Sequence, residues 1–419
     1  MTGQLRRTIL RLRSLWDSPR PLNHPKKHAS GVVGRRNMND RRILSGVTVL
    51  DFTRVIAGPY CTRMMADMGA NVVKIDAIPE DNGPTRTAGS PGNNMGKRSI
   101  TLDLKHLDGI AIARELVARA DVVVENFSPG VMDRFGLGYD DLKDDHPRLV
   151  FASISGFGQY GSFAHRRAYG ATAHAEAGWL WVQQQAVGSE APFAPGITVA
   201  DMAAGLSCFS GILAALYDRE LTGEGQRVDV SLMDAQLSML NEVAAAPLNG
   251  GGEDDWKPFR HPLHAAKDGH LTINIGGARN WERIVEGLGH AGTAMPEGAE
   301  DAVALVSSWV AQLTASEAAA GLEAAGAPYG VSKSMPDAVE HPYFTERGMI
   351  VETGDPLNGS VRAINTPITF SNAKRGPAWD PPLAGGNTRQ ILSELGRTDA
   401  EIDALIAGSA TSEQNDPHD

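Results

Sequence analysis

Apolar, β-branched runs alternate in the first half of the chain with segments whose apolar positions recur at helical spacing. The runs that predict strands are 47–53, 71–77, 99–105, 121–127, 148–155 and 226–232. The segments that predict helices are 59–70, 108–120, 202–219 and 233–246. Strands that are apolar on both faces and separated by helices are typical of a parallel sheet covered on both sides. We therefore expect residues 45–235 to form a large α/β domain.

The composition changes in the second half of the chain. The segment "PLNGGGEDDWKPFRHP" (247–262) is rich in glycine and charge and predicts a loop or domain junction. The strands expected beyond it are 270–275, 348–353 and 360–370. We assign 236–368 to a smaller domain, 369–407 to helices that return to the large domain, and 408–419 to a solvated tail. The fold class expected is α/β, with a Rossmann-like parallel sheet in the large domain and a second, smaller α+β domain.

Charge is distributed unevenly along the chain. Residues 1–42 hold eleven Lys or Arg against Asp17 and Asp40, so this segment carries +9 and the remaining 377 residues carry −20. An acidic body argues against nucleic acid as a general partner. We treat residues 1–44 as a basic disordered tail or as sequence that precedes a true start at Met38, and an Arg-rich transit peptide is a third interpretation.

Cysteine content and hydropathy indicate the compartment. The two cysteines, Cys61 and Cys208, form no CxxC motif, which is typical of a reducing compartment, so we expect a cytoplasmic protein without disulfides. The longest apolar segment, 202–217, is rich in small residues and flanked by acidic ones. A membrane span needs about 20 apolar residues, so we interpret this segment as a core helix and expect no membrane partner.

Two glycine-rich motifs suggest nucleotide binding but fit poorly. "GFGQYG" (156–161) matches GxGxxG, but it follows a late strand and precedes a poor helix start. "GNNMGKRS" (92–99) is one residue short of a P-loop, and Arg98 takes the hydroxyl position. The histidines spaced too loosely to suggest a metal site are His261, His264 and His270. We expect neither a bound dinucleotide nor a metal.

One carboxylate precedes the longest stretch without charge. After Asp201 comes a run of small and apolar residues with no further charge until Asp218, and Gly223 follows the end of the run. Asp is a preferred helix N-cap, and Gly is common just past a helix end. We therefore predict a mostly buried helix over 202–219 with Asp201 as its cap.

Several segments, taken in order, resemble the family III CoA-transferases (the CaiB/BaiF type, the superfamily of formyl-CoA transferase and α-methylacyl-CoA racemase). These segments are "LSGVTVLDFTRVIAGPYCTRMMADMGANVVKID", "GKRSITLDLK", "DVVVENFSPGVMDRFGLGYDDL", "ASISGFGQYG" and "VADMAAGLSCFSGILAALYDRELTGEGQRVDVSLMDAQL". The likeness covers residues 45–405 and implies that Asp201 is the catalytic nucleophile, a role that is compatible with capping a helix.

The resemblance implies transfer of CoA from an acyl-CoA donor to a carboxylic acid acceptor. Asp201 would attack the donor thioester to give a mixed anhydride, and the released CoA thiolate would convert it to an aspartyl-CoA thioester that the acceptor reopens in reverse order. Coenzyme A and acyl-CoA are then substrates, and no cofactor is bound permanently. We expect the helix N-terminus to keep Asp201 ionised and to offer N–H groups to a developing oxyanion.

Matching positions to the family gives a set of expected contacts. Those for CoA are Ile56, Ala57, Leu102, Asp103, Leu104, Lys105, Asn126, Phe127, Ser128, Arg134 and Arg167. Those for the acyl substrate or a covering lid are Tyr169, His174, Gly250, Gly251 and Gly252. Lys105, Arg134 and Arg167 also lie in or next to loops at the ends of predicted strands, where open α/β sheets bind ligands, although surface cations on an acidic protein explain any one of them equally well. The family further implies a homodimer whose chains interlink like rings, with the active site between the large and small domains.

Three positions depart from the family's pattern. Gly170 stands where an acidic residue is frequent, and racemases carry a His-Asp pair ending there. Because two-base racemisation needs a partner opposite Asp201, a racemase using Asp201 and His174 is the alternative function, although a buried structural histidine explains His174 as well. Ile56 and Ala77 replace a glutamine and an arginine of formyl-CoA transferase, which argues against formyl or oxalyl substrates. A non-catalytic dinucleotide-binding module is a third interpretation.

Overall fold

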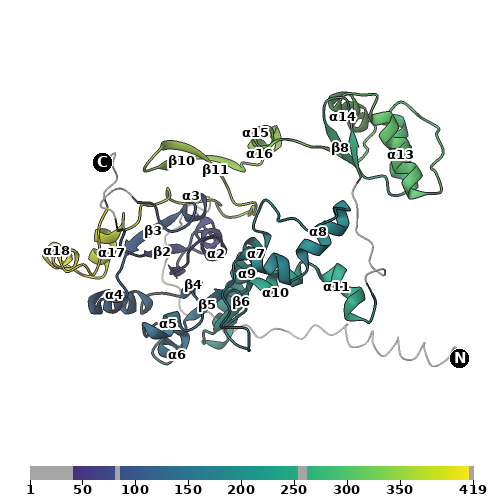
Figure 1. Ribbon diagram of the computed structural model, residues 1–419. Coiled ribbons are helices and arrows are strands. Elements are labelled where there is room, and N and C mark those ends of the chain that lie inside the picture. Colours follow the sequence, from purple (N-terminus) through teal and green to yellow (C-terminus); the bar gives the residue numbers. More distant parts are fainter. Residues whose placement is uncertain (1–40, 81–84, 253–261, 415–419) are drawn as a thin grey trace, which may run out of the picture. The chain divides into compact units, whose positions relative to one another are not determined.

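The computed structural model describes residues 41–80, 85–252 and 262–414, so the basic segment before residue 41 lies outside the described part. Its largest sheet has six parallel strands in the order β3-β2-β1-β4-β5-β6 (Figure 1). These strands are β1 (Thr48–Asp51), β2 (Asn71–Asp76), β3 (Lys97–Thr101), β4 (Val122–Glu125), β5 (Val150–Ser155) and β6 (Arg227–Ser231). The order reverses between β1 and β4, as in the doubly wound nucleotide-binding folds. The expected Rossmann-like parallel sheet is confirmed.

The register explains why these runs are apolar on both faces. Val49 of β1 pairs with Val72 of β2 on one side and with Val122 of β4 on the other, and all three side chains are fully buried. Helices cover both faces of such a sheet, so neither set of alternating side chains meets water.

Three helices build the core on one face of the sheet. They are α2 (Ala57–Asp67), α9 (Val199–Thr222) and α10 (Leu232–Ser238). Helices α2 and α9 approach closely because Gly205 carries no side chain, and a Cβ there would lie 2.7 Å from the carbonyl oxygen of Ala57. The buried thiols of Cys61 and Cys208 belong to this same core. The contact brings the N-terminal turns of α2 and α9 together.

Helix α9 also has the length and composition of a membrane span, and within the described part of the chain it alone meets that test. Half of its apolar window is buried inside the protein, and a core helix satisfies the same criteria. Its burial against α2 and the sheet agrees with the expected core helix.

The other face of the sheet is covered by helices from two distant parts of the chain, residues 107–142 and 388–407. They are α4 (Leu107–Val117), α5 (Val131–Arg134), α6 (Tyr139–Leu142), α17 (Thr388–Glu394) and α18 (Asp399–Ala407). Ile391, Leu392 and Ile402 pack into one core with Ile112 and Phe151. The C-terminal helices therefore pack on the sheet of the large domain.

The segment after β6 differs from the single helix expected over 233–246. Two helices form instead, α10 and α11 (Asn241–Leu248). The first ends in a tight turn, in which the N–H of Leu240 bonds the carbonyl of Leu237 at 2.9 Å, and the side chain of Leu240 is buried while Met239 is exposed. Burying Leu240 therefore turns the chain at a point that helical periodicity alone does not reveal. The remaining helices before β6 are α3 (Pro91–Asn94), α7 (Gly170–Glu176) and α8 (Trp179–Val187).

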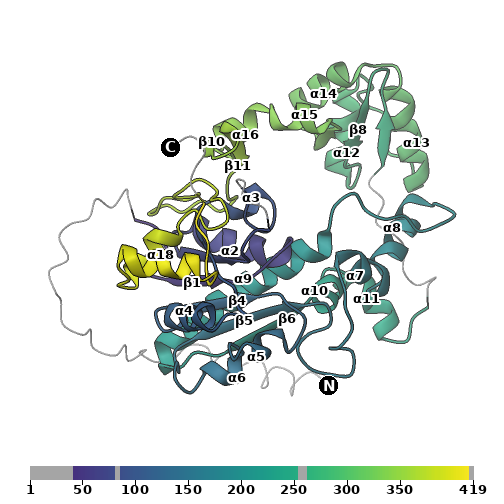
Figure 2. The same cartoon turned by 60° about the vertical axis from the view of Figure 1, so that its left-hand side comes forward.

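A separate antiparallel sheet has its own core. It comprises β7 (Leu263–Ala265), β8 (His270–Ile273) and β9 (Tyr329–Val331), with α12 (Ala278–Gly287), α13 (Ala299–Val310) and α14 (Ala315–Ala324) around it (Figure 2). Two short helices, α15 (Met335–Val339) and α16 (Pro342–Glu346), lead to a hairpin of β10 (Ile350–Asp355) and β11 (Gly359–Ile364). The strand expected over 360–370 thus ends at Ile364.

Candidate active site

The first turn of α9 starts earlier than the capping prediction placed it. The helix begins at Val199 after Thr198, so Asp201 is its third residue and not its N-cap. The side chain of Asp201 is buried, with 8% of its surface exposed. The backbone N–H groups of Asp201 itself and of Ala57, the first residue of α2, act on this carboxylate in the direction that lowers its pKa. The N-terminal turns of two helices therefore meet at this carboxylate.

Burial dominates the electrostatics of Asp201. Removal from water raises the pKa of the carboxyl group above its ordinary value, and the N–H groups of Asp201 and Ala57 oppose this shift only in part. The helix N-terminus was expected to keep Asp201 ionised; the two N–H groups act in that direction, and burial acts against it. A poorly solvated carboxylate is a more reactive nucleophile than a fully hydrated one.

The turn that delivers the N–H of Ala57 is strained and tightly held. Val55 has φ of 71°, a left-handed conformation that is costly for a β-branched residue. The side chain of Asn126, at the end of β4, accepts the N–H of Arg54 at 2.8 Å and donates to its carbonyl at 2.7 Å. The turn between β1 and α2 is thus fixed by a side chain from the neighbouring strand.

A buried ionic network also contacts the turn between β1 and α2. Asp51 accepts the N–H of Thr53 at 2.8 Å, and its other oxygen pairs with Lys97 at 2.9 Å. Lys74 lies 3.6 Å from Asp51 and donates to the carbonyl of Thr53. Although burial opposes ionisation, the charges of Lys74 and Lys97 hold the pKa of Asp51 well below its usual range, and burial lowers the pKa of Lys97 to about 8.

Helix α7 lies against the start of α9. A Cβ at Gly170 would stand 2.1 Å from an oxygen of the Asp201 carboxylate, so only glycine leaves room for the observed position of that group. His174, 2% exposed, accepts the N–H of Ala200 on its Nε2 at 3.1 Å. His174 therefore contacts the backbone beside Asp201 and does not line the cavity described next.

Asp201 opens onto a cavity of about 380 Å³ at the carboxyl ends of β1, β4 and β5. The expected site residues that line it are Ala57, Asn126, Phe127, Ser128, Arg167 and Tyr169. Arg54 and Arg166 also line it, although neither was expected from the sequence. The only signal for Arg54 was its place in the turn after the first strand, where such folds bind ligands. Three arginines make the cavity suitable for anionic ligands.

A second cavity, of about 830 Å³, adjoins the first. Arg54, Phe127 and Val131 line both cavities. The expected residues Leu102, Asp103, Leu104 and Lys105 all line the second one, together with Ala77, the position that departs from formyl-CoA transferase. Arg86 lines it as well while forming a two-bond ion pair with Asp355 (2.7 and 2.8 Å). Nothing in the sequence around Arg86 indicated a role at the site.

Other expected residues do not line either cavity. Ile56 precedes Ala57 but is not part of the wall, and Arg134 lies at the end of α5 with its guanidinium on the carbonyl of Gly130 at 3.2 Å. The glycines 250–252 follow α11, and the residues after them, 253–261, lie outside the described part of the chain. Their role as a lid stays a prediction.

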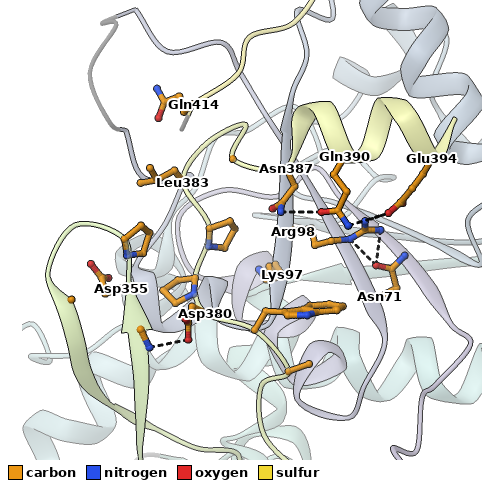
Figure 3. Close-up of a pocket in the computed structure, with 18 residues that line it drawn as sticks. Asn71, Lys97, Arg98, Asp355, Asp380, Leu383, Asn387, Gln390, Glu394 and Gln414 are labelled. Atoms are coloured by element: carbon orange, nitrogen blue, oxygen red, sulfur yellow. Dashed lines mark hydrogen bonds and ion pairs between the residues drawn. The ribbon is translucent and has the colours of Figure 1, made fainter. Parts of the chain in front are cut away.

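A further cavity, of about 940 Å³, lies at the amino ends of β2 and β3 (Figure 3). Lys97 and Arg98 line it, but Lys97 belongs to the Asp51 network and Arg98 pairs with Glu394 at 2.7 Å and Asn71 at 3.0 Å. Ligands of doubly wound folds bind at the opposite, carboxyl ends of the strands. Within the residues that the structure describes, no group of three His, Cys, Asp or Glu side chains could hold a metal ion.

The fold and the site together define an α/β enzyme whose ligand cavities lie at the reversal point of the sheet. The profile of CoA-transferase family III matches residues 44–388, and the chain belongs to this family. Its enzymatic activity is therefore of the family III CoA-transferase type, and the family's substrates are CoA thioesters. The resemblance inferred from the sequence is confirmed.

Named relatives and solved structures agree with this assignment. The chain is 31% identical to succinyl-CoA:glutarate CoA-transferase of Mus musculus (89% of this chain, 91% of the relative) and 32% identical to formyl-CoA:oxalate CoA-transferase of Streptomyces avermitilis (87% and 98%). An acyl-CoA transferase of Fusarium pseudograminearum is 35% identical (91% and 92%). The crystal structure of a CaiB/BaiF family protein from Brucella suis superposes with a TM-score of 0.72 at 28% identity (85% of this chain, all of the other).

Proposed function

We propose that this chain transfers CoA between carboxylic acids with Asp201 as the covalent nucleophile. The observation that carries the proposal is a buried carboxylate on a cavity wall, at the place where the N-terminal turns of α2 and α9 meet. Donors preorganised beside a nucleophile are suited to the oxyanion that forms when the carboxylate adds to a thioester carbonyl. The raised pKa of Asp201 leaves its carboxylate more nucleophilic than a solvated one.

The reaction balances without any further reagent. Asp201 adds to the acyl carbonyl, the C–S bond breaks, and the CoA thiolate leaves behind an aspartyl-acyl anhydride. The thiolate then attacks the aspartyl carbonyl and releases the donor acid as a carboxylate. The acceptor carboxylate attacks the resulting aspartyl-CoA thioester, and the returning thiolate attacks the acceptor's carbonyl to regenerate Asp201.

The two adjoining cavities suit the two ends of CoA. The cavity of about 830 Å³ is lined by apolar residues that include Ile75 and Phe135 and by the cation of Lys105, which fits an adenine and its phosphates. The shared residues Arg54 and Phe127 would then mark the passage of the pantetheine arm toward Asp201. CoA is a substrate in this proposal and not a permanently bound cofactor.

We further propose that the acids are dicarboxylic. Within the described residues, Arg54 stacks on the ring of Phe127 at 4.7 Å, and neither it nor Arg167 pairs with a carboxylate, whereas Arg166 is held by Glu176 at 2.6 and 2.9 Å. Two arginines on the wall beside the nucleophile can therefore receive the distal carboxylate of a diacid. The relatives from Mus musculus and Agrobacterium fabrum are named for succinate and glutarate.

A homodimer is part of the proposal. One face of α9 exposes Met202, Leu206, Tyr217 and Leu221, at 38%, 46%, 70% and 68%. An apolar stripe of this kind is typical of a surface covered by a partner, and the interlinked dimer of the family supplies a second copy of this chain as that partner. We expect Leu206→Glu to yield a monomer in sedimentation. A wild-type chain that sediments as a monomer would contradict the dimer.

The racemase remains the second candidate, with weaker support. His174 would be its second base, but the Nε2 lone pair already accepts the N–H of Ala200, and burial lowers the pKa of the ring. Exchange of solvent deuterium into the α-carbon of an acyl-CoA would favour the racemase.

The proposal also includes a cytoplasmic location and two domains, which span 45–235 and 236–368. The free buried thiols of Cys61 and Cys208 support a reducing compartment.

The proposal is tested by trapping the intermediate. The enzyme incubated with succinyl-CoA and then hydroxylamine should carry a hydroxamate at Asp201, detectable by mass spectrometry, and should pass CoA to glutarate. Asp201→Asn should abolish both, whereas Asp218→Asn, a change of an exposed carboxylate on the same helix, should abolish neither. Transfer by Asp201→Asn at the wild-type rate would refute the nucleophile. Transfer limited to monocarboxylic acids would refute the substrate class alone.

A further inference from the structure

We propose that helix α7 positions Asp201 for attack through two residues, Gly170 and His174, an inference that rests on the proposed nucleophilic role of Asp201. Gly170 is the first residue of α7, and His174 follows one helical turn later. Both are buried, and both face the first turn of α9. Neither residue transfers a proton in this proposal.

Gly170 acts by leaving space. Its absent Cβ would lie 2.1 Å from Asp201 Oδ2 and 3.4 Å from the Cβ of Thr198. Gly170 does not have a positive φ, so the requirement for glycine comes from the neighbouring carboxylate and not from the backbone conformation. A methyl group at this position would have to push the carboxylate out of its observed place between Gly170 and the N-terminal turn of α2.

His174 acts on the backbone beside Asp201. The first N–H groups of a helix have no partner within it, and a buried one without an acceptor is costly. In α9 the N–H of Val199 bonds the carbonyl of Ile197 at 3.2 Å, and that of Ala200 bonds His174 Nε2 at 3.1 Å. The next N–H, that of Asp201, lowers the pKa of its own carboxylate.

The hydrogen bond between Ala200 and His174 determines the protonation state of the imidazole ring. Because Nε2 accepts a hydrogen bond from the N–H of Ala200, the ring is neutral and carries its hydrogen on Nδ1. Burial lowers the pKa of His174, which keeps the ring in this neutral form. The ring of Trp179 lies 6.4 Å away and packs beside it. The acceptor is thus available at neutral pH, and its position is fixed by packing.

The two contacts have a common consequence. They fix the start of α9 and the direction of the Asp201 side chain, and a shift of the order of 1 Å at a reacting atom costs roughly 100-fold in rate. Tyr169, the residue before Gly170, lines the cavity that Asp201 opens onto. A displaced α7 would therefore alter the nucleophile and the cavity wall together, although the residues of the larger cavity would keep their places.

The acceptor role is tested with a matched set at position 174. His174→Gln places a carbonyl oxygen near Nε2, whereas His174→Met has a similar length and no strong acceptor. We expect His174→Met to lose about 10- to 100-fold in kcat with little change in KM for succinyl-CoA, and His174→Gln to recover most of that loss. Two folded variants with equally low kcat would overturn the proposal, because a proton-transfer base and not an acceptor would then be required.

The space requirement is tested with Gly170→Ala, and Ala171→Ser, an exposed change on the same turn, is the control. Gly170→Ala should lose kcat and hydroxamate formation at Asp201 while binding CoA with unchanged affinity in calorimetry. If His174→Met does not fold, Gly170→Ala still decides, since its wild-type kcat would overturn the inference. An inactive Asp201→Asn beside fully active α7 variants would overturn this inference and leave the proposed function in place.

Discussion

The side chain of Asn126 bonds both backbone groups of Arg54, accepting its N–H at 2.8 Å and donating to its carbonyl at 2.7 Å. These two residues follow β4 and β1, neighbouring strands of the sheet. The clamp holds the strained turn through Val55 and with it the position of Ala57, whose N–H lowers the pKa of Asp201. Asn126, expected from the family as a CoA contact, therefore also has a structural role in the turn between β1 and α2.

Removing the clamp should impair catalysis more than folding. Asn126→Leu leaves both backbone groups of Arg54 without this partner and frees the turn, so we expect kcat/KM to fall roughly tenfold or more. Steady-state kinetics with succinyl-CoA would measure the loss. Asn274→Leu, a change of an exposed asparagine in the antiparallel domain, is the control. Equal kinetics for the two variants would show that the clamp is not needed.

The acidic limb of the pH–activity profile should reflect the ionisation of the Asp201 carboxyl group. Attack requires the ionised carboxylate, and burial raises the pKa of this group above the ordinary value of 3.8. Activity should therefore decline on acidification at a pH above that value, since the buried carboxyl holds its proton to a higher pH than a solvated one. The measurement is kcat/KM from about pH 4 to pH 8. A limb at or below the ordinary value would contradict the dominance of burial.

Asp51 should be essential to stability. Its replacement by asparagine leaves Lys74 and Lys97 buried without a counter-charge, and breaking a buried ion pair in this way costs about 3–5 kcal/mol. Urea denaturation of Asp51→Asn would measure the change in the free energy of unfolding. Asp140→Asn, which breaks an exposed pair with Lys143, should leave stability unaltered. A loss no greater than that of the exposed control would contradict the role of the network.

Glu125 should make stability depend on pH near neutrality. Burial raises the pKa of Glu125 to about 7 from an ordinary 4.5, although the N–H of Phe127 bonds its carboxylate at 2.8 Å. Because the folded state binds the proton more tightly, this group's contribution is complete below about pH 4.5 and is lost as the pH rises through 7.

Glu125→Gln separates this contribution from all others. The free energy of unfolding of the variant minus that of the wild type should increase between the two pKa values, by at most about 1.4 kcal/mol per pH unit, and level off above them. Chemical denaturation at a series of pH values provides the comparison. A difference that does not change with pH would show that Glu125 titrates normally in the folded protein.

Periodicity in the sequence was sufficient to predict the six parallel strands and most helices around them, because burial on one or two faces imposes a spacing on apolar residues. Ordered motifs were sufficient to predict the family, and the choice of Asp201 as the nucleophile stays a prediction. The first residue of α9 was wrong by three positions, because the extra turn depends on an acceptor, His174, that comes from another helix. Long-range partners of this kind leave no local pattern.

The arrangement around Asp201 depended on the tertiary structure throughout. Gly170 departs from the family's pattern in the sequence, but its reason is the carboxylate that occupies the space of its missing side chain. Folding places Arg54 and Arg86 on the walls of the cavities. Cys61 and Cys208 are distant in sequence but lie in one core. Local sequence sets which segments become strands and helices, since those choices depend on neighbours a few residues apart. Hydrogen bonds, close approaches and burial between distant segments set the pKa and direction of Asp201, since these act through space.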